Sequence, residues 1–96
     1  MRTDAELVEA AAADDRSAWD ELVVRHGQLV YANARAVGAD PAMAHDVAQV
    51  VWLRLLHRLT TIREPAKIRG WLAIVARNTA RDELRRQRSN APLDAV

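Results

Sequence analysis

The chain of 96 residues contains no cysteine and no phenylalanine, and it has only three glycines and three prolines. The absence of cysteine excludes disulfides, thiol catalysis and every metal site with a cysteine ligand. No stretch approaches the roughly eighteen consecutive apolar residues that a membrane-spanning helix needs. The first residues are polar and acidic and show no signal peptide, so we expect a soluble, cytoplasmic protein with no membrane partner.

The motifs of common enzyme and metal sites are also missing. Histidine occurs at three separated places in the chain, namely at His26, His45 and His57. There is no His-Glu-x-x-His pair, no glycine-rich phosphate loop and no Gly-x-Ser-x-Gly turn. The carboxylates near the N-terminus form an expected solvated face rather than a pair in a pocket. We therefore expect no catalytic residue, no metal and no cofactor, and thus a protein that is not an enzyme.

The chain is rich in residues that favour helices. Half of its residues are hydrophobic, alanine and leucine are abundant, and β-branched runs are short. A chain of this length suits one domain with a single core. The composition predicts an all-α fold, a compact bundle of about four helices.

Capping signals divide the chain into its expected helices, over residues 4–13, 16–37, 41–58 and 65–88. Thr3 and Glu6 form the T-x-x-E capping box that begins the first helix. Asp40 followed by Pro41 is a strong start signal for the third helix. Gly27 lies in the middle of the second helix, where it marks a kink or a close helix crossing. The residues at 89–92 end the fourth helix.

The fourth expected helix has two different faces. Its apolar stripe consists of Ile68, Leu72, Val75, Ala76 and Thr79, and arginines recur on roughly the opposite side, at Arg77, Arg81, Arg85 and Arg88. Residues 63–88 hold eight basic residues against three acids, whereas residues 1–21 hold seven acids against two arginines. This pattern predicts a face that binds nucleic acid. A solvated charged face is one alternative, and packing of the two charged ends against each other is another.

The third expected helix also has two faces. One is an apolar stripe of Ala44, Val47, Ala48, Val51, Leu55 and Leu59. The opposite face carries Val50 and Leu53 among polar residues that include Asp46, Gln49 and His57. Two neighbouring apolar residues with a polar border predict a patch that binds a partner. The alternative is that a larger bundle buries this helix on both sides.

Two segments resemble a known family. Residues 46–55, DVAQVVWLRL, resemble the D-[LV]-x-Q-[ED]-x-[FW]-L-[RK]-[LVA] signature of sigma-70-type initiation factors. Residues 70–78, GWLAIVARN, with the following DELRR, resemble their promoter-reading segment, and WDELV and LVY upstream fit the same domain. The spacing and the short length look like the extracytoplasmic-function group. The resemblance covers roughly residues 4–88.

The resemblance implies a fold of the sigma factor region 2 type, with domain 2 over residues 1–90 and the start of an interdomain linker over 91–96. It implies that the third helix docks on the clamp coiled coil of the largest catalytic subunit of core RNA polymerase, through Asp46, Gln49, Val50, Leu53 and Arg54. It also implies that the fourth helix and the turn before it recognise and melt the −10 promoter element. An anti-sigma protein is a further candidate partner of this group.

The residues implied to bind the single-stranded non-template strand of the −10 element are Arg63, Lys67, Arg69, Arg77, Asn78, Arg81 and Arg85. Within this set, Asn78 matches a position that reads a base, and residues 63–67 match the loop that holds a flipped-out base. The arginines at 77, 81 and 85 match phosphate contacts, and the resemblance makes Trp71 structural.

Two departures from the family pattern stand out. The family usually has an acid after the glutamine, where this chain has Val50, so the polymerase contact is expected to be more apolar or tolerant of change at this position. The family also has a C-terminal helix-turn-helix domain that reads the −35 element, and none is found here. We therefore expect an isolated domain 2. Two rival hypotheses stay open: a helix-turn-helix repressor that binds duplex DNA as a dimer, and a helical adaptor whose basic helix binds an acidic protein.

Overall fold

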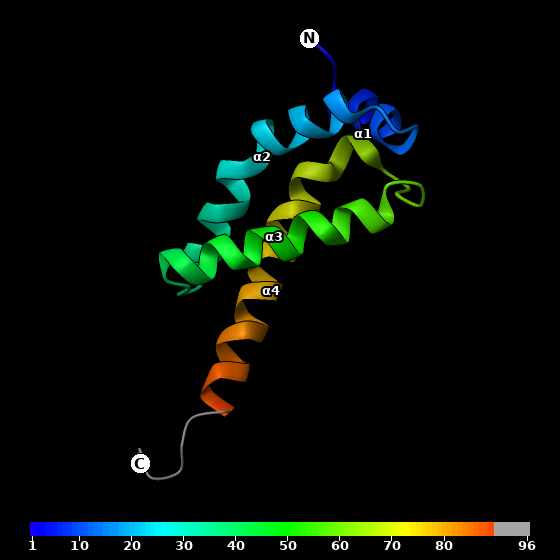
Figure 1. Ribbon diagram of the computed structural model, residues 1–96. Helices are drawn as coiled ribbons and strands as arrows, with labels where there is room; N and C mark the ends of the chain where they lie inside the picture. The colour runs from blue at the N-terminus through cyan, green and yellow to red at the C-terminus, as the bar shows by residue number, and fades with distance from the viewer. Residues whose placement is uncertain (90–96) are drawn as a thin grey trace.

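A computed structural model describes residues 1–89 of the chain, so the predicted linker at 91–96 lies outside the described residues. The described part contains the α-helices α1 (Asp4–Ala12), α2 (Arg16–Ala36), α3 (Pro41–Arg58) and α4 (Ile68–Ser89), with a short 3₁₀ helix, η1 (Pro65–Lys67), before α4 (Figure 1). It contains no strand. The predicted all-α bundle of about four helices is confirmed.

The predicted capping signals form as expected. The Thr3 hydroxyl accepts a hydrogen bond from the Glu6 amide at 3.1 Å, and the Glu6 carboxylate accepts one from the Thr3 amide at 3.0 Å. The Asp15 side chain caps α2, and the Asp40 side chain caps α3, with Pro41 as its first residue. These local bonds explain why the helix starts are predictable from the sequence.

The start of the fourth helix differs from the prediction. Residues 65–67 form a 3₁₀ turn, and the α-helix begins only at Ile68. Pro65 lacks an N–H, and the backbone of Glu64 is outside the helical region, with φ −127° and ψ 73°. The first bond therefore closes over three residues, from the Lys67 amide to the Glu64 carbonyl at 2.9 Å.

The prediction of a close helix crossing at Gly27 is wrong. Apart from its chain neighbours and the backbone of its own helix, a Cβ atom added at this glycine would meet no heavy atom of the described residues within 4 Å. The helix α2 also runs continuously from Arg16 to Ala36. Glycine in a helix interior lowers the stability of the fold, and no contact among the described residues requires a glycine at position 27.

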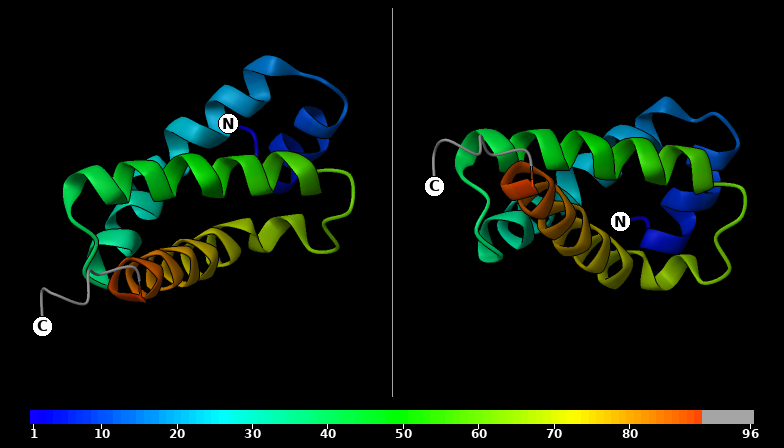
Figure 2. Two further views of the ribbon diagram at one scale, coloured as in Figure 1. Left: turned by 60° about the horizontal axis from the view of Figure 1, so that its bottom comes forward. Right: turned by 90° about the horizontal axis from the view of Figure 1, so that it is seen from below.

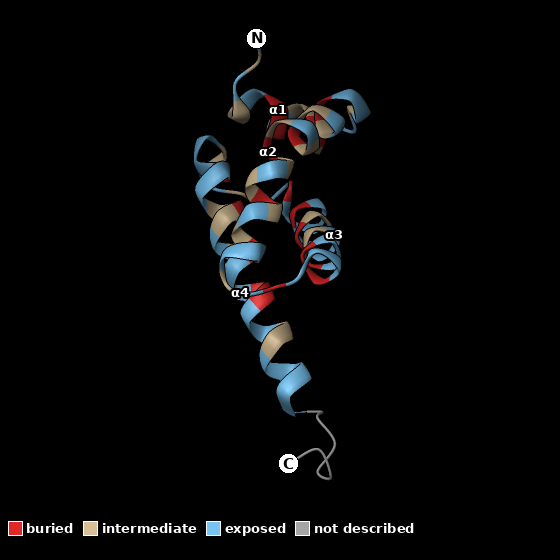
Figure 3. Cartoon of the chain, turned by 90° about the vertical axis from the view of Figure 1, so that its left-hand side faces the viewer, coloured by how far each residue is buried: buried red, intermediate tan, exposed pale blue. Residues whose placement is uncertain are grey.

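The core lies where α2, α3 and α4 pack against one another, and α1 covers one end by packing on α2 and η1 (Figure 2). In Figure 3 the buried residues lie on the sides of the helices that face each other. Both predicted apolar stripes face this core: all members are buried except Ala48 and Val75, which are partly buried. Trp19 and Trp52 join α2 to α3 in an edge-to-face pair with ring centroids 6.0 Å apart. The C-terminal half of α4 projects beyond the other helices (Figure 1).

Candidate nucleic-acid interface

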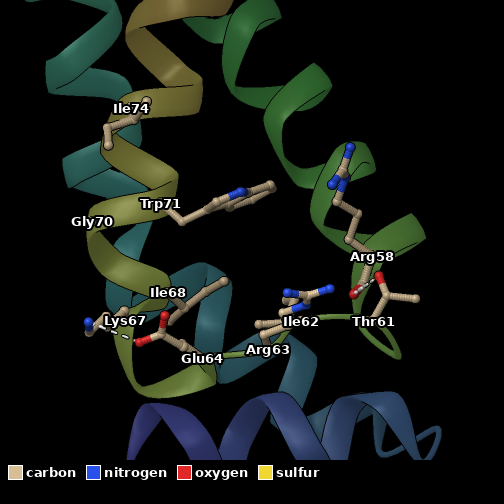
Figure 4. Close-up of a pocket in the computed structure, with 10 residues that line it drawn as sticks. All are labelled: Arg58, Thr61, Ile62, Arg63, Glu64, Lys67, Ile68, Gly70, Trp71 and Ile74. Atoms are coloured by element: carbon tan, nitrogen blue, oxygen red, sulfur yellow. Dashed lines mark hydrogen bonds and ion pairs between the residues drawn. The ribbon is translucent and has the colours of Figure 1, made fainter.

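A hollow of about 580 Å³ lies beside the first turns of α4 (Figure 4). Its walls come from the end of α3, the loop before η1, η1 itself and α4. Three cations line it, Arg58, Arg63 and Lys67, against one acid, Glu64. Lys67 pairs with Glu64 at 2.9 Å, while Arg58 and Arg63 form no ion pair among the described residues. The hollow therefore has a net positive lining.

The apolar part of the same hollow consists of Ile62, Ile68, Trp71 and Ile74. The Trp71 indole extends from α4 across the hollow toward α3 (Figure 4). Trp71 and Ile62 are partly buried against the core, so this wall is held in place by the fold. A cationic rim around an apolar and aromatic wall suits a planar aromatic group attached to an anionic chain.

The predicted basic row on α4 is exposed along its whole length. Arg77 donates from its Nε to the Asn33 side-chain oxygen at 2.7 Å, and Arg85 lies 3.6 Å from Asp82. The Arg81 side chain forms no ion pair or hydrogen bond within residues 1–89. The side chain of Asn78 is likewise exposed and makes no hydrogen bond in the described part of the chain. Its amide is therefore available to a ligand.

Arg69 differs from the other predicted DNA-binding residues. Its Nη1 lies 3.0 Å from Nδ1 of His26, a side chain that is only 1% exposed. The other ring nitrogen of His26, Nε2, lies 2.9 Å from Oδ1 of Asp4. Because a guanidinium can only donate, Nδ1 accepts and Nε2 carries the proton that is donated to Asp4. These two hydrogen bonds, from Arg69 to His26 and from His26 to Asp4, thus connect α1 and α2 to the first turn of α4.

Asp4 also accepts a hydrogen bond from Arg25 at 3.0 Å. Burial by itself would raise the pKa of the Asp4 carboxyl, but the hydrogen bonds from His26 and Arg25 outweigh it, so this pKa is lowered. The charged form of Asp4 is therefore favoured by the fold.

The two oppositely charged ends of the chain do not neutralise each other through ion pairs. The acids near the N-terminus pair locally: Asp15 with Arg2, Glu21 with Arg25, and Asp4 with Arg25. Among the ion pairs of residues 1–89, none joins residues 1–21 to residues 63–88. Apart from Lys67, Arg85 and Arg86, the cations of the second segment form no ion pair there.

The predicted patch on α3 is uncovered. Val50 is 39% exposed and Leu53 is 56% exposed, and Asp46 and Gln49 beside them are exposed as well. The alternative that a larger bundle buries both faces of α3 is therefore wrong for the described residues. Arg54, predicted to belong to this patch, donates from Nη1 to the hydroxyl of Thr79 on α4 at 3.0 Å. Its guanidinium is turned toward α4.

Sequence reasoning missed three residues of these surfaces. Leu56 is exposed and lies three residues after Leu53, so helical spacing could have added it to the patch. Arg58 lines the hollow and follows Arg54 by four residues. Ile74 also lines the hollow and precedes Asn78 by four residues, so it lies on the same face of α4.

Two negative findings apply to residues 1–89. No helix there combines the length and the apolar character that a membrane crossing requires. No group of three or more histidine, aspartate or glutamate side chains is arranged to hold a metal ion.

The fold and the site define a helical module with an uncovered apolar patch on one helix and a basic, partly aromatic surface on another. The family model described as "Sigma-70 region 2" matches residues 22–90 of the 96. The chain belongs to the sigma-70 family, within the extracytoplasmic-function group, and carries region 2 of that family. Its relationship is therefore to transcription initiation factors.

The curated relatives support this assignment. The chain is similar to a probable RNA polymerase sigma factor RfaY of Xanthomonas campestris, 38% identical over 81% of this chain and 20% of the relative. It is similar to an ECF RNA polymerase sigma factor SigM of Mycobacterium tuberculosis, 34% identical over 99% of this chain and 50% of the relative. An RNA polymerase sigma factor NccH of Alcaligenes xylosoxydans is 33% identical over 88% of this chain and 45% of the relative. The chain thus spans half or less of the length of these relatives. No solved structure matches it.

Proposed function

We propose that this chain binds core RNA polymerase through α3 and recognises and melts the −10 promoter element through α4 and the loop before it. The proposal rests on one observation: the packing of the core leaves two separate surfaces exposed. One is the apolar patch around Leu53, and the other is the hollow with the adjoining basic row.

The polymerase contact is proposed for Asp46, Gln49, Val50 and Leu53, with Arg54 at the edge. Exposed apolar residues ringed by polar ones are the arrangement that protein interfaces use, and a few central residues carry most of the binding energy. The expected partner surface is the clamp coiled coil of the largest catalytic subunit. Leu56, which is 49% exposed, extends the apolar part of the patch.

The DNA contact is proposed for the hollow and the exposed face of α4. A base that leaves the stack needs a pocket with an apolar wall and pays a few kcal/mol, least when it is already unpaired. The hollow, with its Trp71 wall and two arginines that have no ion pair among residues 1–89, supplies such a pocket. Asn78 reads a base with its free amide, and Arg77, Arg81 and Arg85 hold phosphates of the non-template strand. Arg63 and Lys67 border the pocket. Arg69 contacts the DNA only when its hydrogen bond to His26 is broken.

The test compares three ligands for the same protein. Fluorescence anisotropy measures affinity for a single strand that has been selected from a random pool, and for the duplex of the same sequence. A pull-down measures association with core RNA polymerase. We expect the single strand to bind more tightly than the duplex, and the polymerase to be retained.

The rival hypotheses predict other results. Equal or tighter binding to the duplex would favour the helix-turn-helix repressor, although α4, at 22 residues, is long for a recognition helix. Binding to neither DNA nor polymerase would favour the adaptor, whose basic helix meets an acidic protein.

A further inference from the structure

A second hollow, of about 350 Å³, lies in the groove between the C-terminal half of α3 and α4. Its lining consists of Arg54, His57 and Arg58 from α3, and of Trp71 and Val75 from α4. Within the described part of the chain, no acidic side chain lines it. The groove therefore combines two guanidinium groups and an imidazole with an indole. Sites that bind single-stranded nucleic acid combine cationic groups with aromatic rings in this way.

The second hollow adjoins the first one. Arg58 and Trp71 line both, so they form the wall between them. In Figure 4 the Trp71 indole reaches from α4 toward the side of α3 that carries Arg58. An indole that separates two hollows can stack on a base in either of them, and Arg58 can follow the phosphate that links the two bases.

A hydrogen bond holds the Arg54 side chain at the edge of this groove. Its Nη1 donates to the Thr79 hydroxyl at 3.0 Å, and Thr79 is almost completely buried at the side of α4 that faces α3. The bond uses one of the guanidinium nitrogens and orients the group across the groove, with its other N–H groups left to contact an anion. Arg54 is thus turned away from the centre of the polymerase patch.

We propose that the α3–α4 groove is a second nucleotide site, which takes the single-stranded DNA where it leaves the first hollow. This inference rests on the proposed DNA-binding function and extends the DNA surface along α3, from Arg58 back to His57 and Arg54. Arg54, His57 and Arg58 contact the sugar-phosphate chain, and Trp71 stacks on the base. The groove presents cations and a ring face, so it holds the strand with little preference for sequence.

The test uses a single strand selected for binding and the same strand extended by three nucleotides at each end in turn. Affinities are measured near 0.15 M salt, where charges more than about 8 Å apart are screened. The variant His57→Glu places a negative charge in the second hollow alone. The matched control, His45→Glu, makes the same change on an exposed residue of α3 that lines neither hollow.

We expect extension at one of the two ends to tighten binding to the unaltered protein. His57→Glu should weaken binding to that extended strand about fivefold, the repulsion of two unit charges roughly 4 Å apart in water. The shorter strand should bind almost unchanged, and His45→Glu should alter neither affinity. In a second variant, Arg58→Gln, the salt slope for the extended strand should fall by about 0.7, as for one lost phosphate contact.

Each result decides one of the two proposals. Failure of the unaltered protein to bind either strand would overturn the DNA-binding function itself, and this inference with it. Binding of both strands with equal affinity, or binding of the extended strand that His57→Glu leaves unchanged, would overturn the second site alone. Helical circular dichroism of both variants checks the fold, which is expected to tolerate changes at these exposed positions.

Discussion

Arg69 donates a hydrogen bond from Nη1 to the buried Nδ1 of His26, over a distance of 3.0 Å. The bond connects the first turn of α4 to the middle of α2, next to the proposed DNA pocket. An arginine in a sequence with a basic helix is expected to face the nucleic acid, yet this one satisfies a buried imidazole. Loss of such a donor leaves a buried acceptor without a partner.

We therefore expect Arg69→Gln to lower the free energy of unfolding by about 1–3 kcal/mol. Thermal unfolding measures the loss, and the exposed Arg81→Gln is the control, expected to stay within about 0.5 kcal/mol of the unaltered protein. An unchanged thermal midpoint for Arg69→Gln would contradict a structural role. A fall of about 0.7 in the DNA salt slope would show that Arg69 reaches a phosphate as well.

Alanine substitutions at Asn78 and at Arg81 are expected to affect DNA binding in different ways. Arg81→Ala should weaken binding to all single strands about equally and lower the salt slope by about 0.7, because one phosphate contact is lost. Asn78→Ala should relax the preference at one −10 position, worth roughly 1–3 kcal/mol, and leave the slope unchanged. Titrations against single-base substitutions at several salt concentrations separate the two effects. Uniform weakening by Asn78→Ala would show that this residue does not read a base.

Leu53→Asp is expected to abolish association with core RNA polymerase without unfolding the protein. The side chain is 56% exposed, so a charge is tolerated in the free protein but is buried without a partner in the complex. The cost should be at least about 2 kcal/mol, or roughly thirtyfold in affinity, measured by a quantitative pull-down. Val24→Asp, at an 83% exposed apolar residue on α2, is the control. Normal binding by Leu53→Asp would place the polymerase contact elsewhere.

Gly27 and Gly38 should respond to alanine with opposite signs. Gly27 lies inside α2, and the described residues leave open space where an alanine Cβ would lie, so Gly27→Ala should raise the free energy of unfolding by about 1 kcal/mol. Gly38 has φ +110°, where alanine is strained, so Gly38→Ala should destabilise. For a domain of this size, thermal midpoints should shift about 4–8 °C per kcal/mol. A loss of stability in Gly27→Ala would indicate a role for this glycine that the described contacts do not show.

Acid should destabilise the fold through its capping and tethering carboxylates. The pKa of Asp4 is lowered by bonds from His26 and Arg25, which outweigh its burial, and the pKa of Asp15 is lowered chiefly by the Ser17 side chain. A lowered pKa in the folded state adds stability above the unfolded value, near 4, and this stability is lost as the pH falls below it. Thermal midpoints should therefore be measured from neutral pH to about pH 3. They should drop as the pH falls below about 4, the unfolded pKa.

The matched variants locate this effect. Asp4→Asn should flatten the drop, because the neutral amide no longer exchanges a proton between the folded and unfolded states. Glu9→Gln, on an exposed position of α1 without an ion pair among the described residues, should leave the drop unchanged. Identical pH profiles for Asp4→Asn and the unaltered protein would show that Asp4 does not carry the effect.

The sequence by itself determined the four helices, apart from the start of the last one, and the faces of α3 and α4. Thr3, Asp40 and Pro41 act within a few residues of themselves, so their capping roles do not depend on the rest of the fold. The stripes on α3 and α4 follow from the spacing of apolar residues, because one face of each helix must leave water. The exposed Leu53 and the basic row could be predicted for the same reason.

Only the tertiary structure decided what lies between the helices. The sequence does not show that His26 meets Arg69, or that Arg54 turns to Thr79, because these pairs are 43 and 25 residues apart. The two hollows are lined by residues of both α3 and α4, so they exist only because these two helices pack side by side. Propensity and capping act over one turn of chain, whereas a shared wall such as Trp71 exists only once two helices have packed together.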